Sequence, residues 1–402
     1  MVAEVDQDPR AAEFVQDPYP FYHHVRALGP AFHWRQYGHL CVPGFEAVNR
    51  LLRDRRFGRQ VLHLTNREAL GWPEPDARLA DFHAVERCSL LELEPPDHTR
   101  LRTLVNRAFV SRHVERLRPR IAALAHELID GVNGPTFDLL EQFATPIPVR
   151  IIAALLGIDE AMAPQLLQWS HRLVAMYQFR RSASEEASAN VAAIEFSAFI
   201  RDEIVRCRRQ PGDDLLSNLV GAAGATAGLS EPEIVSTVIL LLNAGHEASV
   251  HAIGNGVKAI LETGLEPAAL FASSSAASTA VEEILRYDPP LHMFTRYALE
   301  DVEIGGQVLR LGDRIGLMLG AANRDPARYV DPDRFDPGRD ASGHTSFGAG
   351  IHFCLGAPLA RLEIEVALPI LFARYPRLRL AEVPRYRDTY HFHGLERLIL
   401  TT

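Results

Sequence analysis

Residues 346–363 read SFGAGIHFCLGAPLARLE, a glycine-rich loop that carries one cysteine directly into a predicted helix. Cys354 stands near the predicted start of this helix, where the helix dipole and free N–H groups favour a thiolate. Phe347 and His352 add an aromatic wall and a hydrogen-bond donor to the same loop. The glycines permit backbone angles that other residues avoid, so the loop can fold tightly against a flat ligand. They are Gly348, Gly350 and Gly356.

A lone cysteine is more often a small buried hydrophobic residue than a ligand. The spacing Phe-Gly-x-Gly-x-His-x-Cys-x-Gly is far more specific, because it resembles the haem-binding signature of the cytochrome P450 family. The resemblance covers about residues 18–402. It implies a single domain over 1–402, mainly α with a smaller β-rich region, that encloses a buried haem b (iron protoporphyrin IX). Cys354 would be the iron ligand, and the other five loop residues named above would contact the cofactor.

A second match lies upstream. Residues 283–286 read Glu-Ile-Leu-Arg and resemble the family's Glu-x-x-Arg element, and 332–335 read Pro-Asp-Arg-Phe as in its meander. Alone, Glu-x-x-Arg is usually a surface ion pair. The resemblance implies that Glu283, Arg286 and Arg334 form a buried network that holds the cysteine loop. Removing one partner would then strand a buried charge, at a cost of roughly 3–5 kcal/mol.

Three further residues match the family's haem-propionate ligands. His98 and Arg102 are four positions apart, so they share one face of a predicted helix that starts at Asp97. Arg296 lies on a predicted strand. Taken singly, each would more often be a solvated surface charge. Together, at family spacing, they are predicted to bind the cofactor.

A long helix is predicted over 231–261, and its run 234–242 is apolar nearly all round, which indicates a buried central helix. The following residues, 244–249, read Ala-Gly-His-Glu-Ala-Ser and resemble the family's oxygen-activation motif. The small Ala244 would leave room above the iron. Glu247 is the candidate proton source.

Ala248 departs from the family pattern, which has a threonine hydroxyl at this position. Ser249 follows and is kept as a third catalytic candidate, although one helical step turns it by about 100°. We hypothesise that a water or a substrate hydroxyl completes proton delivery from Glu247. The alternative is a poorly coupled oxygenase that loses reducing equivalents as peroxide.

The net charge of −9 argues against nucleic acid as a partner. The N-terminus is acidic and lacks an apolar core, so neither a signal peptide nor a membrane anchor is expected. Four widely spaced cysteines indicate no disulfide framework and favour the cytoplasm. One segment, 100–120, is strongly basic and could simply be a solvated helix face. The family resemblance implies that it lies on the cysteine side of the haem, where it would attract an acidic ferredoxin, with its reductase as the electron source. Its arginines include Arg102, Arg107, Arg112, Arg116 and Arg118.

The resemblance implies a monooxygenase that inserts one atom of O2 into a C–H or similar bond of a small hydrophobic substrate. Polar groups among the expected pocket residues favour a substrate that itself carries polar groups. Two other classes stay open: a haem-thiolate enzyme that uses peroxide or rearranges its substrate without external electrons, and a haem-bearing binding or sensor protein. The sequence does not identify the substrate. The expected pocket residues are Asn243, Ala244, His292, Met293, Phe294, His391 and Phe392.

Local patterns predict long helices through most of 97–286 and two hairpins. The first pairs residues 32–35 with 39–42, and the second turns at Gly305 and Gly306. A Ser/Ala-rich patch at 273–278 and a Gly/Ala-rich patch at 221–228 are predicted to be surface loops.

Overall fold

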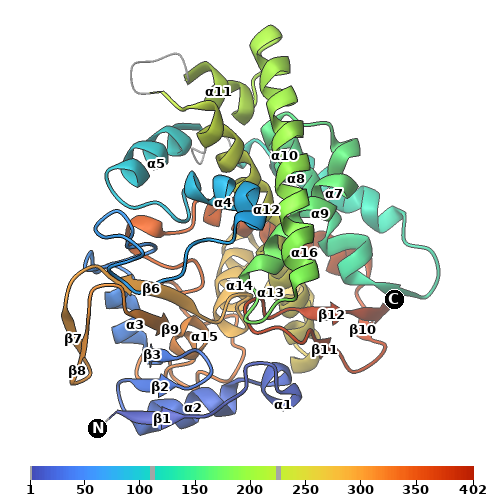
Figure 1. Cartoon of the computed structure of the whole chain (residues 1–402). Coiled ribbons are helices and arrows are strands. Elements are labelled where there is room, and N and C mark those ends of the chain that lie inside the picture. The colour runs from blue at the N-terminus through green and yellow to red at the C-terminus, as the bar shows by residue number, and fades with distance from the viewer. Residues whose placement is uncertain (1, 109–113, 223–227) are drawn as a thin grey trace. The chain divides into compact units, whose positions relative to one another are not determined.

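The computed structural model of the chain describes residues 2–108, 114–222 and 228–402 (Figure 1). The chain forms two compact units. Unit 1 comprises Met1–Leu64, Ala122–Ala144 and Ala248–Thr402, and unit 2 comprises Thr65–Ile121 and Thr145–Glu247. The helix α12, Glu231–Thr263, contributes residues to both units. It matches the helix predicted over 231–261. That residues 1–402 form one domain stays a prediction.

Unit 1 holds the strands. The largest sheet has six, in the order β1-β2-β3-β9-β6-β4, and Figure 1 shows β2, β3 and β9 side by side. The smaller sheets are β10-β13-β5, β11-β12 and β7-β8. The strands are β1 Ala3–Val5, β2 Phe32–Trp34, β3 His39–Val42, β4 Phe57–Gly58, β5 Thr136–Asp138, β6 Phe294–Ala298, β7 Val302–Ile304, β8 Gln307–Leu309, β9 Arg314–Leu317, β10 Arg379–Leu380, β11 Arg385–Tyr386, β12 Leu395–Arg397 and β13 Ile399–Thr401.

Both predicted hairpins are confirmed. Strands β2 and β3 pair antiparallel with Phe32 opposite Cys41, and β7 pairs with β8 across Gly305 and Gly306. These two glycines have φ of +60° and +79°, the left-handed values that a tight two-residue turn requires. Alternation along the strands then buries side chains on both faces of the six-stranded sheet. Trp34 belongs to one core cluster and Leu40 to another.

In unit 1, α12 (Glu231–Thr263) passes close to α14 (Ser274–Tyr287). A Cβ at Gly256 would lie 2.7 Å from the Ile284 side chain, so only glycine allows this approach. The unit also contains most of α7. Its helices are α1 Ala12–Gln16, α2 Tyr19–Leu28, α3 Phe45–Leu51, α7 Arg118–Asp130, η2 Leu140–Ala144, α13 Pro267–Leu270, α14 Ser274–Tyr287, α15 Leu319–Asn323, η5 Gly350–His352 and α16 Ala357–Arg374.

Unit 2 is helical in its described part. Trp169 of α9 stacks on Phe196 of α10 with ring centroids 4.9 Å apart, and the Asn190 side chain of α10 accepts from two backbone N–H groups at the start of α4. Its elements are η1 Ala77–Leu79, α4 Ala80–Arg87, α5 Asp97–Ala108, α8 Pro146–Leu156, η3 Glu160–Met162, α9 Ala163–Val174, η4 Ala175–Tyr177, α10 Ala183–Arg209 and α11 Leu215–Ala222.

One loop prediction was wrong. Residues 273–278 are not a surface loop but the beginning of α14, because the Ser273 side chain caps the helix by accepting from the Ala276 N–H. The 221–228 prediction falls largely on residues outside the described ranges. Within those ranges, no helix has the length and apolar character needed to cross a membrane.

Candidate active site

The cysteine loop is closed by backbone hydrogen bonds. The Gly348 N–H donates to the Thr345 carbonyl at 2.8 Å, and the Cys354 N–H donates to the Phe347 carbonyl at 2.9 Å. The chain then enters α16 three residues after Cys354, with Gly356 at the N-cap. The cysteine is half-buried at this position. The loop therefore presents one thiol from the start of a long helix, as the sequence predicts.

Two glycines shape this loop. Gly348 and Gly350 have φ of +66° and +70°, which side-chain-bearing residues rarely adopt. A Cβ at Gly350 would lie 2.5 Å from the Leu52 carbonyl oxygen, and one at Gly348 would lie 3.2 Å from the Phe294 ring. The loop can follow this path only without side chains at these two positions.

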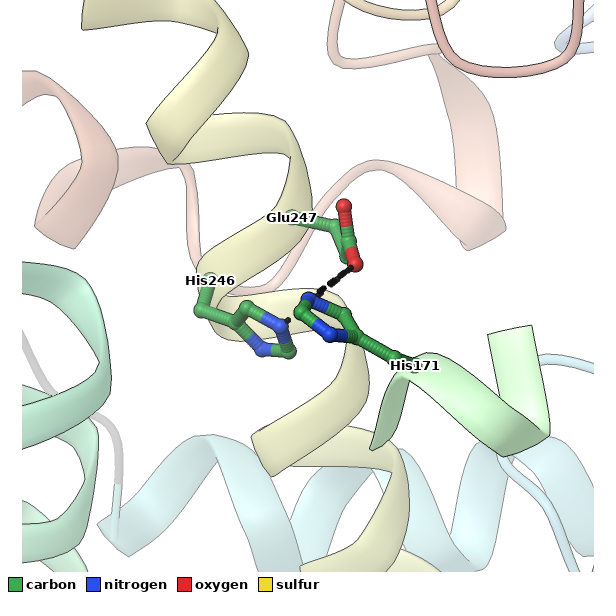
Figure 2. A group of neighbouring side chains, drawn as sticks. All are labelled: His171, His246 and Glu247. Atoms are coloured by element: carbon green, nitrogen blue, oxygen red, sulfur yellow. Dashed lines mark ion pairs between the residues drawn. The ribbon is translucent and has the colours of Figure 1, made fainter. Parts of the chain in front are cut away.

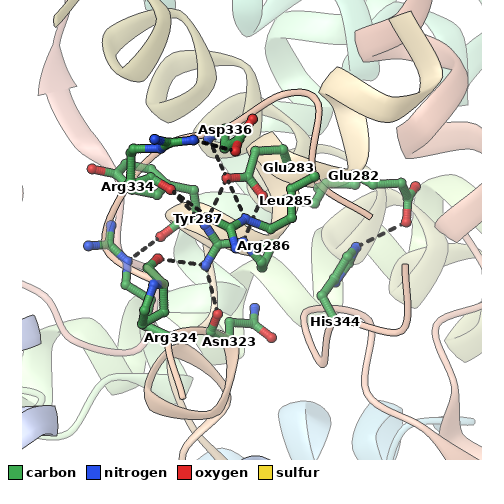
Figure 3. Close-up of polar contacts among 12 residues, drawn as sticks. Glu282, Glu283, Leu285, Arg286, Tyr287, Asn323, Arg324, Arg334, Asp336 and His344 are labelled. Atoms are coloured by element: carbon green, nitrogen blue, oxygen red, sulfur yellow. Dashed lines mark hydrogen bonds and ion pairs between the residues drawn. The ribbon is translucent and has the colours of Figure 1, made fainter. Parts of the chain in front are cut away.

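Helix α14 carries a fully buried ion pair between Glu283 and Arg286 (Figure 3). Glu283 accepts from Arg286 through both carboxylate oxygens, at 2.7 and 2.8 Å, and neither side chain is exposed. Glu283 also accepts from the Asp336 N–H at 2.7 Å. Arg286 donates further to the carbonyls of Asn323 and Pro332, each at 2.8 Å. Burial with this many partners offsets much of the desolvation cost of both charges.

Arg334 takes part differently from the prediction. Its guanidinium is 66% exposed and pairs with Asp336 at 2.7 Å, so it is not part of the buried charge network. Only its carbonyl contributes, by accepting from Arg286 at 3.3 Å. The oxygens of Glu283 are already occupied, and the arginine that approaches them from the meander is Arg339, with its Nε 3.6 Å away.

Asn323, which the sequence analysis missed, connects the ion pair to the cysteine loop. Its carbonyl accepts from Arg286, and its side-chain oxygen accepts from the N–H and hydroxyl of Thr345 at 2.7 and 2.9 Å. Its side-chain N–H donates to the Ser346 hydroxyl at 2.7 Å, which donates in turn to the Leu285 carbonyl. No pattern near α15 indicates this role, because it depends on contacts between distant segments.

A second link joins α14 to α16. Glu282 accepts from Arg361 at 3.0 Å and lies 3.4 Å from His344 (Figure 3). Burial alone would raise the pKa of the Glu282 carboxyl, but His344 and Arg361 outweigh it and hold that pKa at about 2. Arg361 also lies over the Phe347 ring, 4.6 Å from its centroid. The carboxylate therefore fixes the helix that follows the cysteine.

Strand β6 places a buried cation beside the loop's aromatic neighbour. Arg296 is only 4% exposed, donates to the Thr295 carbonyl at 3.0 Å, and has its guanidinium carbon 5.6 Å from the Phe294 ring centroid. Phe294 and Arg296 alternate with Thr295, so they share one face of the strand.

Helix α12 has an accessible stripe in an otherwise buried stretch. Leu240 and Ala248 are half-buried and Ala244 is exposed, whereas most residues between them are buried. Positions four apart lie on one face of a helix. The stripe is therefore narrow and, at two of its three positions, lined by alanine.

Glu247 is buried on α12 and contacts two histidines of unit 2 (Figure 2). Its Oε1 lies 3.1 Å from the Nε2 of His171 on α9 and 3.7 Å from the Nε2 of His246. His171 is half-exposed, whereas His246 is buried. Sequence reasoning singled out Glu247 but not its partner on α9.

Ser249 faces a different neighbour. It is buried and lies beside Glu363 of α16, whose pKa burial raises to about 8 despite the opposing effect of the Ser249 hydroxyl. The catalytic role of Ser249 stays a prediction, and the step of about 100° along the helix places it on a different face from Ala248.

Comparisons with known proteins agree with this site. A family model described as Cytochrome P450 matches residues 277–385, which include the ion pair and the cysteine loop. The chain is 36% identical to the biotin biosynthesis cytochrome P450 of Bacillus subtilis (strain 168), over 97% of this chain and 98% of that protein. The chain belongs to the cytochrome P450 family. It is also 38% identical to 6-deoxyerythronolide B hydroxylase of Saccharopolyspora erythraea, over 97% of both chains.

Among solved structures, P450BioI in complex with an acyl carrier protein that carries hexadec-9Z-enoic acid aligns with a TM-score of 0.90. It is 36% identical, and the alignment covers 98% of this chain and 100% of that one. The protein is thus a cytochrome P450 monooxygenase, an oxidoreductase with haem b as its cofactor. Residues of unit 1 fit that group: a half-buried thiol on a glycine-shaped loop and a buried arginine on β6.

Two predicted pocket residues of this cytochrome P450 are packed among core side chains. His292 is fully buried, with its Nδ1 2.6 Å from the Tyr22 hydroxyl and its ring 4.3 Å from that of His393. Met293 packs in the core cluster that contains Trp34. Strand β6 begins only at Phe294, so both residues precede it and are held by α2 and the C-terminal segment. That they line the substrate pocket stays a prediction.

The other pocket candidates keep that status as predictions. Asn243 is 8% exposed, and its side-chain oxygen has no hydrogen-bond partner among the described residues. His391 and Phe392 are half-buried, with ring centroids 4.7 Å apart. Burial and the charge of Arg59 lower the pKa of His391 to about 4, which keeps its imidazole neutral.

Helix α5 carries the remaining cofactor candidates in unit 2. His98 is buried, and Arg102 donates to Asn106 at 3.1 Å. In the basic segment, Arg112 lies outside the described residues, and the side chain of Arg107 is not described.

Proposed function

We propose that Cys354 is the thiolate ligand of haem b and that the protein oxidises a C–H bond of a small hydrophobic substrate bearing polar groups. One observation carries this proposal: the glycine-shaped loop that presents Cys354 is joined through Asn323 to a fully buried ion pair. Such a loop is held rigidly, as a metal ligand requires. The bound haem supplies oxygen activation, and the protein's residues supply orientation and proton control.

Proton delivery would begin at Glu247. At the next position the family pattern has a threonine hydroxyl, which Ala248 lacks. Ser249 is the next residue, but one helical step turns it by about 100° from Ala248, so it would not simply replace the missing hydroxyl. A water or a substrate hydroxyl would complete the path. The variant Ala248→Thr tests this idea through the ratio of product formed to reducing equivalents consumed. Coupling that rises only for substrates lacking the hydroxyl supports substrate assistance, and an equal rise for every substrate contradicts it.

The substrate is proposed to donate a hydrogen bond to Asn243. A buried amide oxygen without a partner costs about 1–3 kcal/mol, which a bound hydroxyl or amide would recover. One relative is named 6-deoxyerythronolide B hydroxylase, and P450BioI was solved with a fatty acid on an acyl carrier protein. The test panel holds terpenoids, steroids, macrolide precursors and fatty acids, free or on a carrier protein. A ligand that shifts the haem from low to high spin in the native protein, and at least about tenfold more weakly in Asn243→Leu, would support this role.

Electrons are proposed to come from a ferredoxin and its reductase in the cytoplasm. The support is the basic segment 100–120 on a chain of net charge −9, because opposite local charge speeds association. Reversing Arg107 and Arg112 to glutamate should slow ferredoxin-driven reduction more than reduction by dithionite. If the variant slows reduction by ferredoxin and by dithionite equally, the docking proposal is wrong.

A further inference from the structure

Three potential metal ligands of unit 2 converge where α9 meets α12 (Figure 2). The Nε2 atoms of His171 and His246 lie 3.1 and 3.7 Å from Glu247 Oε1, and all three ligand atoms lie within 4.8 Å of one another. A tetrahedral zinc ion with ligands at roughly 2.0–2.1 Å separates neighbouring ligand atoms by about 3.4 Å. The two distances to Glu247 bracket this value, and the histidine ligand atoms lie within 4.8 Å of each other, so side-chain shifts would bring all three to one cation.

His246 is already arranged as a ligand. Its Nδ1 lies 2.8 Å from the Leu242 carbonyl oxygen, so Nδ1 carries the hydrogen and Nε2 presents a lone pair. That Nε2 is buried and has no hydrogen-bond partner among the described residues. A ring nitrogen donating to a backbone carbonyl is the usual support of a metal-bound histidine, because it fixes the tautomer and the ring orientation. The Nε2 lone pair of His246 therefore faces Glu247 and accepts no hydrogen bond from another described residue.

The ligand atoms of the three residues indicate which ions would bind, and the exposure of His171 indicates how an ion would enter. Two imidazoles and one carboxylate suit zinc and neighbouring transition metals, whereas magnesium and calcium prefer oxygen ligands alone. The His171 side chain is 53% exposed and that of Glu247 is 8% exposed, so an ion can enter from the His171 side. A water would occupy the fourth position.

The chain contains a second such cluster, which lacks these features. Asp288, His292 and His393 are all buried, so no ion has a path to them. Asp288 accepts from the hydroxyls of Tyr19 at 2.6 Å and Tyr386 at 2.5 Å, so its oxygens are occupied. The Asp288 cluster is therefore a structural polar cluster, whereas the His246 cluster has an unused lone pair and is reached by solvent through His171.

We propose that His171, His246 and Glu247 bind one divalent transition-metal cation of the zinc class. Binding would occupy the Glu247 carboxylate and so slow substrate oxidation reversibly. Only this catalytic consequence rests on the proposed function; the binding site itself does not.

Calorimetric titration of the haem-loaded protein with zinc chloride tests the site. We expect one zinc per chain, and at least about tenfold weaker binding in His171→Ala, since losing even an outer-shell partner costs 10–100-fold. His171 is exposed enough for this variant to fold. The exposed His126 on α7 is the control, and His126→Ala should bind zinc like the native protein. The site would be overturned if the native protein and His171→Ala bind zinc with equal affinity. It would also be overturned if zinc binds only to other surface histidines.

Crystals soaked in zinc chloride locate the ion independently. Anomalous difference maps recorded above and below the zinc edge should show one peak between the three side chains, distinct from iron. Zinc should also slow product formation in the native protein and much less in His171→Ala. If zinc binds at these residues but turnover does not change, the metal site stands and the proposed inhibition is wrong. That inhibition depends on Glu247 as the proton source.

Discussion

The Asn323 side-chain amide donates to the Ser346 hydroxyl across 2.7 Å, and this contact joins the buried ion pair of α14 to the cysteine loop. Asn323→Ala would leave the buried Thr345 N–H without its acceptor. We expect the free energy of unfolding to fall by about 1–3 kcal/mol, with a lower haem content in the purified protein. Urea denaturation and the ratio of haem to protein absorbance measure these effects. The exposed Asn133→Ala should stay within about 0.5 kcal/mol of the native protein, and equal losses in the two variants would contradict this role.

Among the described glutamate–arginine pairs with i,i+3 spacing, one is fully buried and another is largely exposed. Glu283 and Arg286 are fully buried, whereas Glu115 and Arg118 are 59% and 42% exposed. Glu283→Ala should lower the free energy of unfolding by roughly 3–5 kcal/mol, because it strands a buried guanidinium. Glu115→Ala should lower it by less than about 1 kcal/mol, because solvent screens that pair. Chemical denaturation of both variants makes the comparison, which fails if the two losses are similar.

Gly350 and Gly343 both have left-handed backbones, with φ of +70° and +82°, but only one is crowded. A Cβ at Gly343 would lie 3.9 Å from the Arg328 side chain, whereas one at Gly350 would lie 2.5 Å from the Leu52 carbonyl oxygen. Alanine should cost roughly 1–2 kcal/mol at either position for the left-handed conformation. Only Gly350→Ala should also displace the cysteine loop and reduce haem binding. Haem titration of the two variants decides, and similar haem affinity in both would argue against a tightly fitted loop.

Glu363 predicts a pH dependence of stability. Burial raises the pKa of its carboxyl to about 8, above the value of about 4.3 in an unfolded chain. Between these values the folded protein holds a proton that the unfolded chain releases, so stability falls as pH rises through this window. Glu363→Gln keeps the shape without titrating and should reduce this slope. Unfolding in urea at about pH 5 and about pH 8 measures how the free energy of unfolding changes with pH. If this change is the same in Glu363→Gln, other groups cause the pH dependence.

Local patterns predicted the elements that local physics controls. The Gly305–Gly306 hairpin follows from residues that accept positive φ, and the span of α12 follows from a long apolar run. The cysteine loop was predictable because its glycines and its thiol lie within ten residues of one another. Capping was missed at Ser273, where a serine-rich stretch looked like a loop but begins α14.

Contacts between distant segments were not predictable in this way. Asn323, Glu282 and His171 have no local signal, since their roles depend on partners that other helices or loops bring to them. The exposure of the Arg334 guanidinium was also set by packing, and it differs from the prediction of a buried network member.

The most direct test of the central claim is the absorption spectrum of the reduced, haem-loaded protein under carbon monoxide, recorded for the native chain and for Cys354→Ser. If Cys354 is the ligand, the native protein will show the long-wavelength Soret band typical of thiolate ligation. Cys354→Ser will then lose that band, whether or not it keeps haem. The same band in Cys354→Ser, or none in the haem-loaded native protein, would contradict ligation by Cys354.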